Sequence, residues 1–150
     1  TLYFNKILPA GVAGLMECAD LVLAGKATES VQDETNAGYE GIIRDAESRI
    51  NWANHVDFTY NLIRGCNPAP GAWTTFEGKK YFIYECSKKI AGTFGEVRGK
   101  KIGQIVAQNG TNLVIHGQGG FIEVQRIRPD GGKKSAASES GLEVGAILGG

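Results

Sequence analysis

The side chains in this chain that are best suited to catalysis or metal binding are two histidines and three cysteines. His55 and His116 lie far apart in the sequence, and neither stands near a cysteine pair. The cysteines Cys18, Cys66 and Cys86 show no Cys-x-x-Cys spacing, so the ligand spacing of structural zinc sites is absent and we expect no metal. No secretion signal is visible in the sequence, and an odd number of cysteines in such a chain favours reduced thiols in the cytoplasm over a disulfide framework.

Short motifs that carry catalysis or phosphate binding are also absent from the sequence. The run Gly117-Gln118-Gly119-Gly120 lies between two expected strands, so it predicts a turn and not a phosphate-binding loop before a helix. No Gly-x-Ser-x-Gly elbow occurs. No apolar run approaches the roughly 20 residues that a membrane-spanning helix needs, so we expect no membrane partner. These motifs therefore indicate no catalytic and no cofactor-binding residue.

Positive charge is concentrated in the second half of the chain, although the formal net charge is zero. Residues 1–76 hold five Lys/Arg and nine Asp/Glu, whereas residues 77–134 hold eleven Lys/Arg and five Asp/Glu. A basic segment beside an acidic one permits contact with a polyanion. The candidates for such contact are Lys79, Lys80, Arg98, Lys100, Lys101, Arg126 and Arg128. The favoured alternative is that lysine pairs in turns keep hairpins soluble and protect sheet edges.

These candidates must be positioned by helices in the first part of the chain and by strands in the rest. Apolar residues at helical spacing predict a helix over residues 9–25, with Pro9 in its first turn and Gly25 after its end. The apolar face of this helix needs a packing partner. Residues 26–51 are polar and follow neither period, so we expect an extended linker.

A second helix is expected between Asn54 and Gly65. Asn54 is the expected cap, with Asp57 in the reciprocal position three residues later. Pro68 prevents the helix from continuing. The apolar stripe of this helix comprises Val56, Thr59, Tyr60 and Ile63, widened by Phe58 and Leu62.

From Trp73 onward the hydrophobic period changes to two, which predicts short strands. Asn109-Gly110 predicts a type I′ hairpin turn, with positive φ at both residues. The expected strands cover residues 73–76, 80–86, 104–108, 111–116 and 121–127, with a further short strand near 93–94 and a helical turn and a strand after 134. Arg126 and Arg128 share one side of their strand if the side chains alternate. The pattern predicts a small OB-like barrel, with an open sandwich as the alternative.

The junction Asn67-Pro68-Ala69-Pro70-Gly71-Ala72-Trp73 resembles the Asn-Pro-x-Pro-Gly-Ala-Trp hallmark of one enzyme family, the 10-formyltetrahydrofolate-dependent formyltransferases, in their C-terminal domain. Residues 1–27 resemble the last helix of the catalytic lobe. Their sequence is most similar to that of the hydrolase domain of 10-formyltetrahydrofolate dehydrogenases. Leu142–Gly149 is similar to the closing segment of methionyl-tRNA formyltransferases. Residues 87–101 resemble nothing in the family.

The resemblance implies an α+β fragment, in which an N-terminal helix and linker precede a helix and a small antiparallel OB-like β-barrel. Residues 1–30 are then the trailing helix of a catalytic lobe that lies outside this chain, 31–52 a linker, and 53–150 the barrel domain. In the family, the lobe is Rossmann-like and carries the catalytic Asn, His and Asp. It is the expected partner of this chain, and 10-formyltetrahydrofolate is the expected cofactor of the whole enzyme.

Three functions stay open at this point. The preferred one is the non-catalytic C-terminal part of an enzyme of the hydrolase or dehydrogenase branch. The second is the tRNA-contacting domain of a methionyl-tRNA formyltransferase, and a relative that formylates a sugar nucleotide is a further possibility. The third is a free-standing OB-type nucleic-acid-binding module, in which Tyr81, Phe82, Tyr84 and Phe121 stack on bases. The formyl acceptor and the oligomeric state are not predicted.

Overall fold

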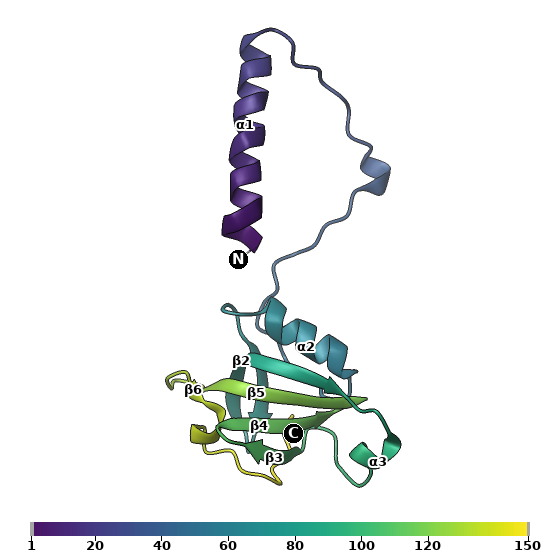
Figure 1. The fold of residues 1–150 in the computed structure, drawn as a ribbon, viewed down its shortest axis with the longest axis vertical. Helices are drawn as coiled ribbons and strands as arrows, with labels where there is room; N and C mark the ends of the chain where they lie inside the picture. Colours follow the sequence, from purple (N-terminus) through teal and green to yellow (C-terminus); the bar gives the residue numbers. More distant parts are fainter. Residues whose placement is uncertain (1, 150) are drawn as a thin grey trace. The chain divides into compact units, whose positions relative to one another are not determined.

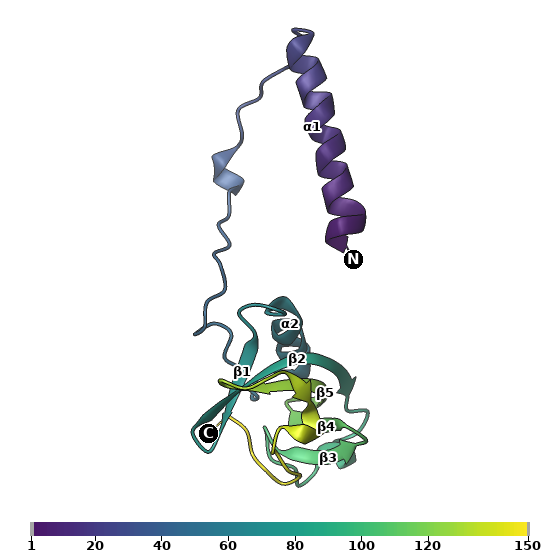
Figure 2. The same ribbon diagram turned by 90° about the vertical axis from the view of Figure 1, so that its left-hand side faces the viewer.

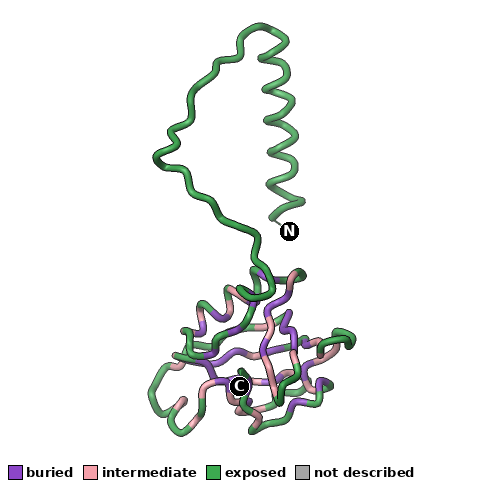
Figure 3. The backbone as a smooth tube through the Cα atoms, turned by 180° about the vertical axis from the view of Figure 1, so that it is seen from behind, coloured by how far each residue is buried: buried purple, intermediate pink, exposed green. Residues whose placement is uncertain are grey.

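The computed structural model describes residues 2–149, and the chain divides into two compact units, 1–40 and 41–150. In the first unit, a π-helical turn, Tyr3–Ile7, runs into helix α1, Leu8–Leu23, with Pro9 in its first turn. Gly25 follows the helix with φ of +65°, as the sequence predicts. A single 3₁₀ turn, Glu34–Asn36, interrupts the segment after it. Every described residue of this unit is exposed (Figure 3).

The second unit consists of a helix and a six-stranded antiparallel sheet (Figure 1). Its strands follow the order β1-β2-β5-β4-β3, and β6 pairs with β5. The α+β fold class predicted from the sequence is therefore confirmed. The elements are α2 (Val56–Gly65), β1 (Ala72–Phe76), β2 (Lys79–Ile90), α3 (Phe94–Val97), β3 (Ile105–Asn109), β4 (Asn112–Gly117), β5 (Gly120–Pro129), β6 (Ser135–Ala136) and a 3₁₀ turn, Ala137–Glu139.

Two bulges bend the long pair formed by β2 and β5. Ile83 pairs with Ile127, but Glu85 pairs with Arg126 and Cys86 with Val124, so Tyr84 and Gln125 have no opposite residue. Such extra residues bend a strand and increase its twist. Figure 2 shows the curvature of β2. Because of this bend, β2 pairs with β1 and with β5, and β5 in turn pairs with β4.

Backbone hydrogen bonds from the C-terminal segment cover the outer edges of the sheet. On the β3 side, Gly145 N–H donates to the carbonyl of Ile105 at 2.8 Å, and Leu148 N–H donates to that of Gly103 at 2.9 Å. On the β1 side, Gly149 N–H donates to the carbonyl of Thr75 at 2.8 Å. The same segment thus bridges the first and last strands of the sheet order, which is how an OB-like barrel removes its edges.

The edge of β1 is also covered by a segment that precedes it in the sequence. Trp73 N–H donates to the carbonyl of Ser48 at 3.0 Å, and Ile50 N–H donates to the carbonyl of Trp73 at 2.7 Å. Ser48 and Ile50 are buried. Residues 48–50 therefore act as a short additional strand on the barrel surface.

The core lies inside the barrel and beneath α2. Trp52 and Thr74 are both nearly inaccessible, and Trp52 Nε1 donates to Thr74 Oγ1 at 3.0 Å, which satisfies two buried polar groups. The aliphatic core side chains that are 0% exposed are Val56 and Ile63 from α2 and Ile83, Ile105, Leu113, Ile115, Ile122, Val124 and Ile127 from the strands.

The helix α2 begins one residue later than predicted, and its apolar stripe is narrower. His55 is the cap, because its Nδ1 accepts a hydrogen bond from Asp57 N–H at 3.3 Å. Asn54 instead lies in the preceding turn, where its N–H donates to the carbonyl of Asn51 at 3.1 Å. Phe58 is 69% exposed and does not join the core. Gly65 is the last helical residue, as predicted.

Two local predictions in the β-rich part were wrong. Residues 93–94 form no strand but lead into α3, because the Glu96 carboxylate accepts Gly92 N–H at 3.0 Å and folds the segment into a single turn. The hairpin after β3 pairs Asn109 with Asn112, so its central residues are Gly110 and Thr111. Only Gly110 has positive φ, at +60°. This is the type II′ pattern, with glycine in the first central position.

We predict that Gly103→Ala destabilises the barrel more than Gly110→Ala. Both glycines have positive φ, but a Cβ on Gly103 would lie 2.4 Å from the Leu148 carbonyl oxygen, whereas one on Gly110 meets nothing. We expect losses of unfolding free energy of about 3 and about 1 kcal/mol respectively, measured by urea denaturation. Equal losses in the two variants would contradict the role assigned to the Gly103–Leu148 contact.

Candidate binding surfaces

The seven basic residues singled out from the sequence fall into two separate groups. Lys79, Lys80, Arg126 and Arg128 lie on the β1–β2 end of β2 and on the adjoining part of β5. Arg98, Lys100 and Lys101 follow α3, where Lys100 Nζ lies 5.7 Å from the centre of the Phe121 ring at the start of β5. Phe121 and Arg128 are about 20 Å apart along this strand. The candidates therefore do not form one continuous patch.

Around the first group, cations alternate with aromatic rings in what we call the cation–aromatic ladder. The centre of the Trp73 ring lies 5.5 Å from Arg49 Cζ and 3.9 Å from Lys80 Nζ. Arg128 Cζ lies 4.4 Å from the centre of the Phe82 ring and 5.9 Å from that of Tyr84. The complete ladder is Arg49, Trp73, Lys80, Phe82, Arg128, Tyr84 and Lys134.

Two of the four ladder cations have carboxylate partners. Lys80 Nζ lies 2.6 Å from Asp45 Oδ1, and Lys134 Nζ lies 2.9 Å from Glu85 Oε1. Neither Arg49 nor Arg128 forms an ion pair with a residue in the described range 2–149. Arg128 Nε is buried and has no hydrogen-bond partner there. The ladder therefore presents two uncompensated guanidinium groups, which suit phosphate or carboxylate ligands.

The ladder also limits what the aromatic rings can do. Phe82 and Tyr84 are 7% and 8% exposed, and their faces are covered by the cations of the chain itself. Tyr81 belongs to the core. A stacking platform for nucleobases needs open ring faces. The rings of Tyr81, Phe82 and Tyr84 are thus not available for base stacking, and the ladder cations are suited to charge contact.

Sequence reasoning found Lys80 and Arg128 but missed Arg49 and Lys134. Lys134 Nζ lies 4.7 Å from the ring centre of Tyr84, which is the bulged residue of β2, and no sequence signal marks that bulge. Arg49 is close to Trp52 in the sequence, but the tryptophan that it contacts is Trp73. The pairing of residues 48–50 with β1 brings these two side chains together.

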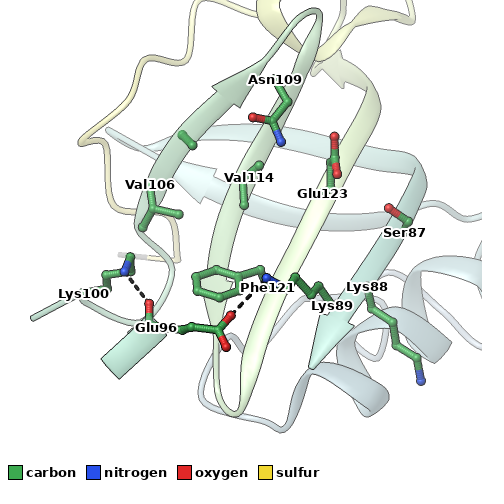
Figure 4. Close-up of a pocket in the computed structure, with 11 residues that line it drawn as sticks. Ser87, Lys88, Lys89, Glu96, Lys100, Val106, Asn109, Val114, Phe121 and Glu123 are labelled. Atoms are coloured by element: carbon green, nitrogen blue, oxygen red, sulfur yellow. Dashed lines mark hydrogen bonds and ion pairs between the residues drawn. The ribbon is translucent and has the colours of Figure 1, made fainter. Parts of the chain in front are cut away.

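A second surface is a hollow of about 600 Å³ on the outside of the sheet, which we call the outer hollow (Figure 4). Ala107, Val114, Glu123 and Ser87 form a row across β3, β4, β5 and β2, because each is the register partner of the next. Phe121 forms the floor beside this row. The remaining lining residues are Lys88, Lys89, Glu96, Lys100, Val106 and Asn109.

An ion pair and a hydrogen bond fix one wall of the outer hollow. Lys89 Nζ lies 3.0 Å from Glu96 Oε2, and Lys100 Nζ donates to the Glu96 carbonyl (Figure 4). The hydrogen bond from Lys89 holds the pKa of the Glu96 carboxyl below its usual value. Lys88 points away from the hollow toward Asp57, whose pKa it lowers chiefly by a side-chain hydrogen bond. Lys89 and Lys100 are thus the cations that face the hollow.

The two histidines occupy structural positions. His55 caps α2. His116 is 5% exposed, its Nδ1 lies 3.0 Å from the Lys101 carbonyl oxygen, and its ring lies 5.6 Å from that of Phe121. Among residues 2–149, no group of three or more His, Cys, Asp or Glu side chains is placed to hold a metal ion. None of the helices in that range is long and apolar enough to cross a membrane.

Comparison with known proteins identifies the barrel. The family model described as "Formyl transferase, C-terminal domain" matches residues 42–141. The chain belongs to this family. The resemblance drawn from the junction at residues 67–73 is therefore confirmed. The formyltransferase match begins close to the start of the second compact unit and ends after the last 3₁₀ turn.

Relatives come from two branches of the formyltransferase family. The human mitochondrial 10-formyltetrahydrofolate dehydrogenase is 32% identical over 143 residues, which are 92% of this chain and 15% of that protein. The methionyl-tRNA formyltransferase of Carboxydothermus hydrogenoformans is 36% identical over 133 residues, which are 87% of this chain and 41% of that protein. The chain thus spans less than half the length of either relative, and both branches match it.

Solved structures show the same fold. A crystal structure of a HypX variant from Aquifex aeolicus superposes with a TM-score of 0.69 at 15% identity, over 92% of this chain and 24% of HypX. HypX in complex with tetrahydrofolic acid gives a TM-score of 0.66 at 15% identity, again over 92% of this chain and 24% of HypX. At such identity the likeness extends to the fold alone.

We predict that Cys18 is alkylated well before the other two thiols. Burial raises the pKa of the Cys86 thiol to about 12, partly opposed by Arg64, and burial also raises the pKa of the Cys66 thiol. At mildly alkaline pH these two therefore stay protonated and unreactive, whereas Cys18 is exposed. Iodoacetamide labelling followed by mass spectrometry measures the three rates, and labelling in denaturant provides the control. Labelling of Cys86 in the folded protein at the rate of Cys18 would contradict its burial.

Proposed function

We propose that this chain is the non-catalytic C-terminal part of a one-carbon enzyme that uses 10-formyltetrahydrofolate, in the hydrolase or dehydrogenase branch. The match to the human dehydrogenase covers 92% of the chain and so extends beyond residues 42–141, as does the match to the methionyl-tRNA formyltransferase over 87%. The observation that carries the choice of branch is the resemblance of residues 1–52 to the hydrolase domain of 10-formyltetrahydrofolate dehydrogenases. Residues 1–30 are then the trailing helix of a Rossmann-like catalytic lobe, 31–52 the linker and 53–150 the accessory barrel domain.

The requirements of formyl transfer support an active site in the catalytic lobe rather than in this chain. A tetrahedral oxyanion needs hydrogen-bond donors, and a group titrating near neutrality must move a proton. In this chain, His116 is 5% exposed and His55 caps a helix. Both histidines therefore already have structural roles. In the proposed enzyme, the catalytic Asn, His and Asp and the bound folate belong to the lobe, and the barrel orients the acceptor or the partner beside it.

We predict that the purified chain neither hydrolyses 10-formyltetrahydrofolate nor transfers its formyl group. The assay follows folate absorbance and formate release, with the methionyl-tRNA formyltransferase of Carboxydothermus hydrogenoformans and its tRNA substrate as the positive control. Turnover that co-purifies with the chain and disappears in the His116→Gln variant would overturn the placement of the active site outside this chain.

A second candidate function is contact with tRNA, as in the transferase branch. The observation that favours it is the ladder, where Arg49 and Arg128 present guanidinium groups without carboxylate partners in the described residues. Contacts of this kind bind phosphate irrespective of sequence. In this alternative, the candidates Lys79, Lys80, Arg126 and Arg128 meet the nucleic acid together, and Arg98, Lys100 and Lys101 meet it separately.

Binding to initiator tRNA at two salt concentrations separates the branches. For the hydrolase branch we expect no affinity that depends steeply on salt. For the transferase branch, log K falls steeply with log salt, and Arg128→Gln reduces that slope by about one. Lys6→Gln, at an exposed position outside the barrel, is the matched control. A steep slope that responds to Arg128→Gln but not to Lys6→Gln would replace the first candidate by the second.

A further inference from the structure

We propose that the outer hollow is a binding site for a small aromatic acid, namely a planar ring with a carboxylate at one end and an N–H or O–H donor at the other. This goes beyond the proposed function, in which the barrel has no ligand of its own. Three features of the hollow suit such a ligand, namely its apolar floor, its two lysines and its acceptor at the opposite end.

The floor is apolar on the face of the sheet where polar residues are expected. The inward side chains Leu113, Ile115, Ile122 and Val124 already fill the core. The next residues along the strands should face solvent and be polar. Instead, Val114 and Phe121 point outward into the hollow (Figure 4).

The bulge in β3 adds further apolar surface. Ile105 pairs with Ile115, and Ala107 pairs with Val114, so Val106 is the extra residue. Both Val106 and Ala107 line the hollow. Phe121 is 9% exposed, so the floor comprises the accessible part of its ring and the aliphatic side chains beside it. A flat ring covers such a floor by edge and van der Waals contact.

One end of the hollow is cationic. Lys89 is the register partner of Phe121, and Lys100 Nζ lies 5.7 Å from its ring centre. Glu96 compensates only one of these two charges. A carboxylate placed over the edge of the Phe121 ring meets both ammonium groups, and charge-assisted hydrogen bonds of this kind are the stronger ones.

The other end offers an acceptor. Glu123 lies two residues from Phe121 on β5 and points to the same face, about 7 Å further along. Asn112 Nδ2 donates to Glu123 Oε1 at 2.9 Å. Glu123 Oε2 accepts no hydrogen bond from residues 2–149. A donor on the far side of a para-substituted ring reaches this oxygen while the acid group remains at the lysines.

The size of the hollow agrees with this ligand class. Its volume of about 600 Å³ lies within the range of roughly 300–1,000 Å³ that is usual for small-molecule sites. The hollow is partly open to solvent, which gives a ligand a way in. The opposite charges at its two ends select the orientation of the ligand.

The test is an NMR titration of the whole chain with ¹³C-labelled valine methyl groups, with 4-aminobenzoate as the probe. We expect saturable shifts at Val106 and Val114. Benzoate, which lacks the donor, binds more weakly, and aniline, which lacks the acid, binds more weakly still. Lys100→Gln raises the Kd for 4-aminobenzoate about fivefold. Lys101→Gln, at the exposed neighbouring position outside the lining, leaves the Kd unchanged.

Three results would overturn the proposal. The first is the absence of saturable shifts at Val106 and Val114 in protein whose spectrum shows a folded barrel. The second is equal affinity in the Lys100→Gln and Lys101→Gln variants, which would remove the role of the cationic end. The third is a response confined to Val12 and Val22 of α1, which would indicate general adsorption of aromatic compounds to exposed apolar side chains.

Discussion

Closure of the sheet by the C-terminal segment is the constraint on which the rest of the barrel depends. Residues 145–149 hydrogen-bond to β3 on one side and, through Gly149, to β1 on the other. Gly103 and Gly149 allow this approach, since a Cβ on Gly103 would meet the Leu148 carbonyl and one on Gly149 would meet the Trp52 ring. The closed barrel buries Trp52, and within residues 2–149 it leaves no long sheet edge for another chain to pair with.

Bulges within the closed barrel determine what its outer face presents. In β5, Val124 and Ile127 both face the core because Gln125 is an extra residue between them. The outward positions are therefore Phe121 and Glu123 before the bulge, and Arg126 and Arg128 after it. The first pair faces the outer hollow, and Arg128 enters the ladder. A single strand thus supplies two surfaces of different chemistry.

Much of this fold could be predicted from the sequence, because local signals determine it. The end of α2 at Gly65 and the strands from Trp73 onward follow from hydrophobic period, glycine and proline. The family followed from residues 67–73. Features that depend on distant partners could not be predicted, such as the pairing of residues 48–50 with β1 and the bulges in β2 and β5. The single turn at α3 depends on a contact of Glu96 that has no periodic signature.

The two candidate surfaces also differ in how they were anticipated. Basic residues can be recognised directly in the sequence, so Lys80 and Arg128 were identified as candidates. The contacts of Arg49 and Lys134 with the aromatic rings became evident only from the three-dimensional structure. The outer hollow was not predicted, because Val106, Val114 and Phe121 have the alternation of ordinary strand residues. The bulged residue Gln125 carries a last consequence for how such a domain diversifies. The alternation of inward and outward side chains along β5 shifts by one residue at Gln125. Substitutions before this residue can therefore change the hollow while the residues of the ladder stay the same.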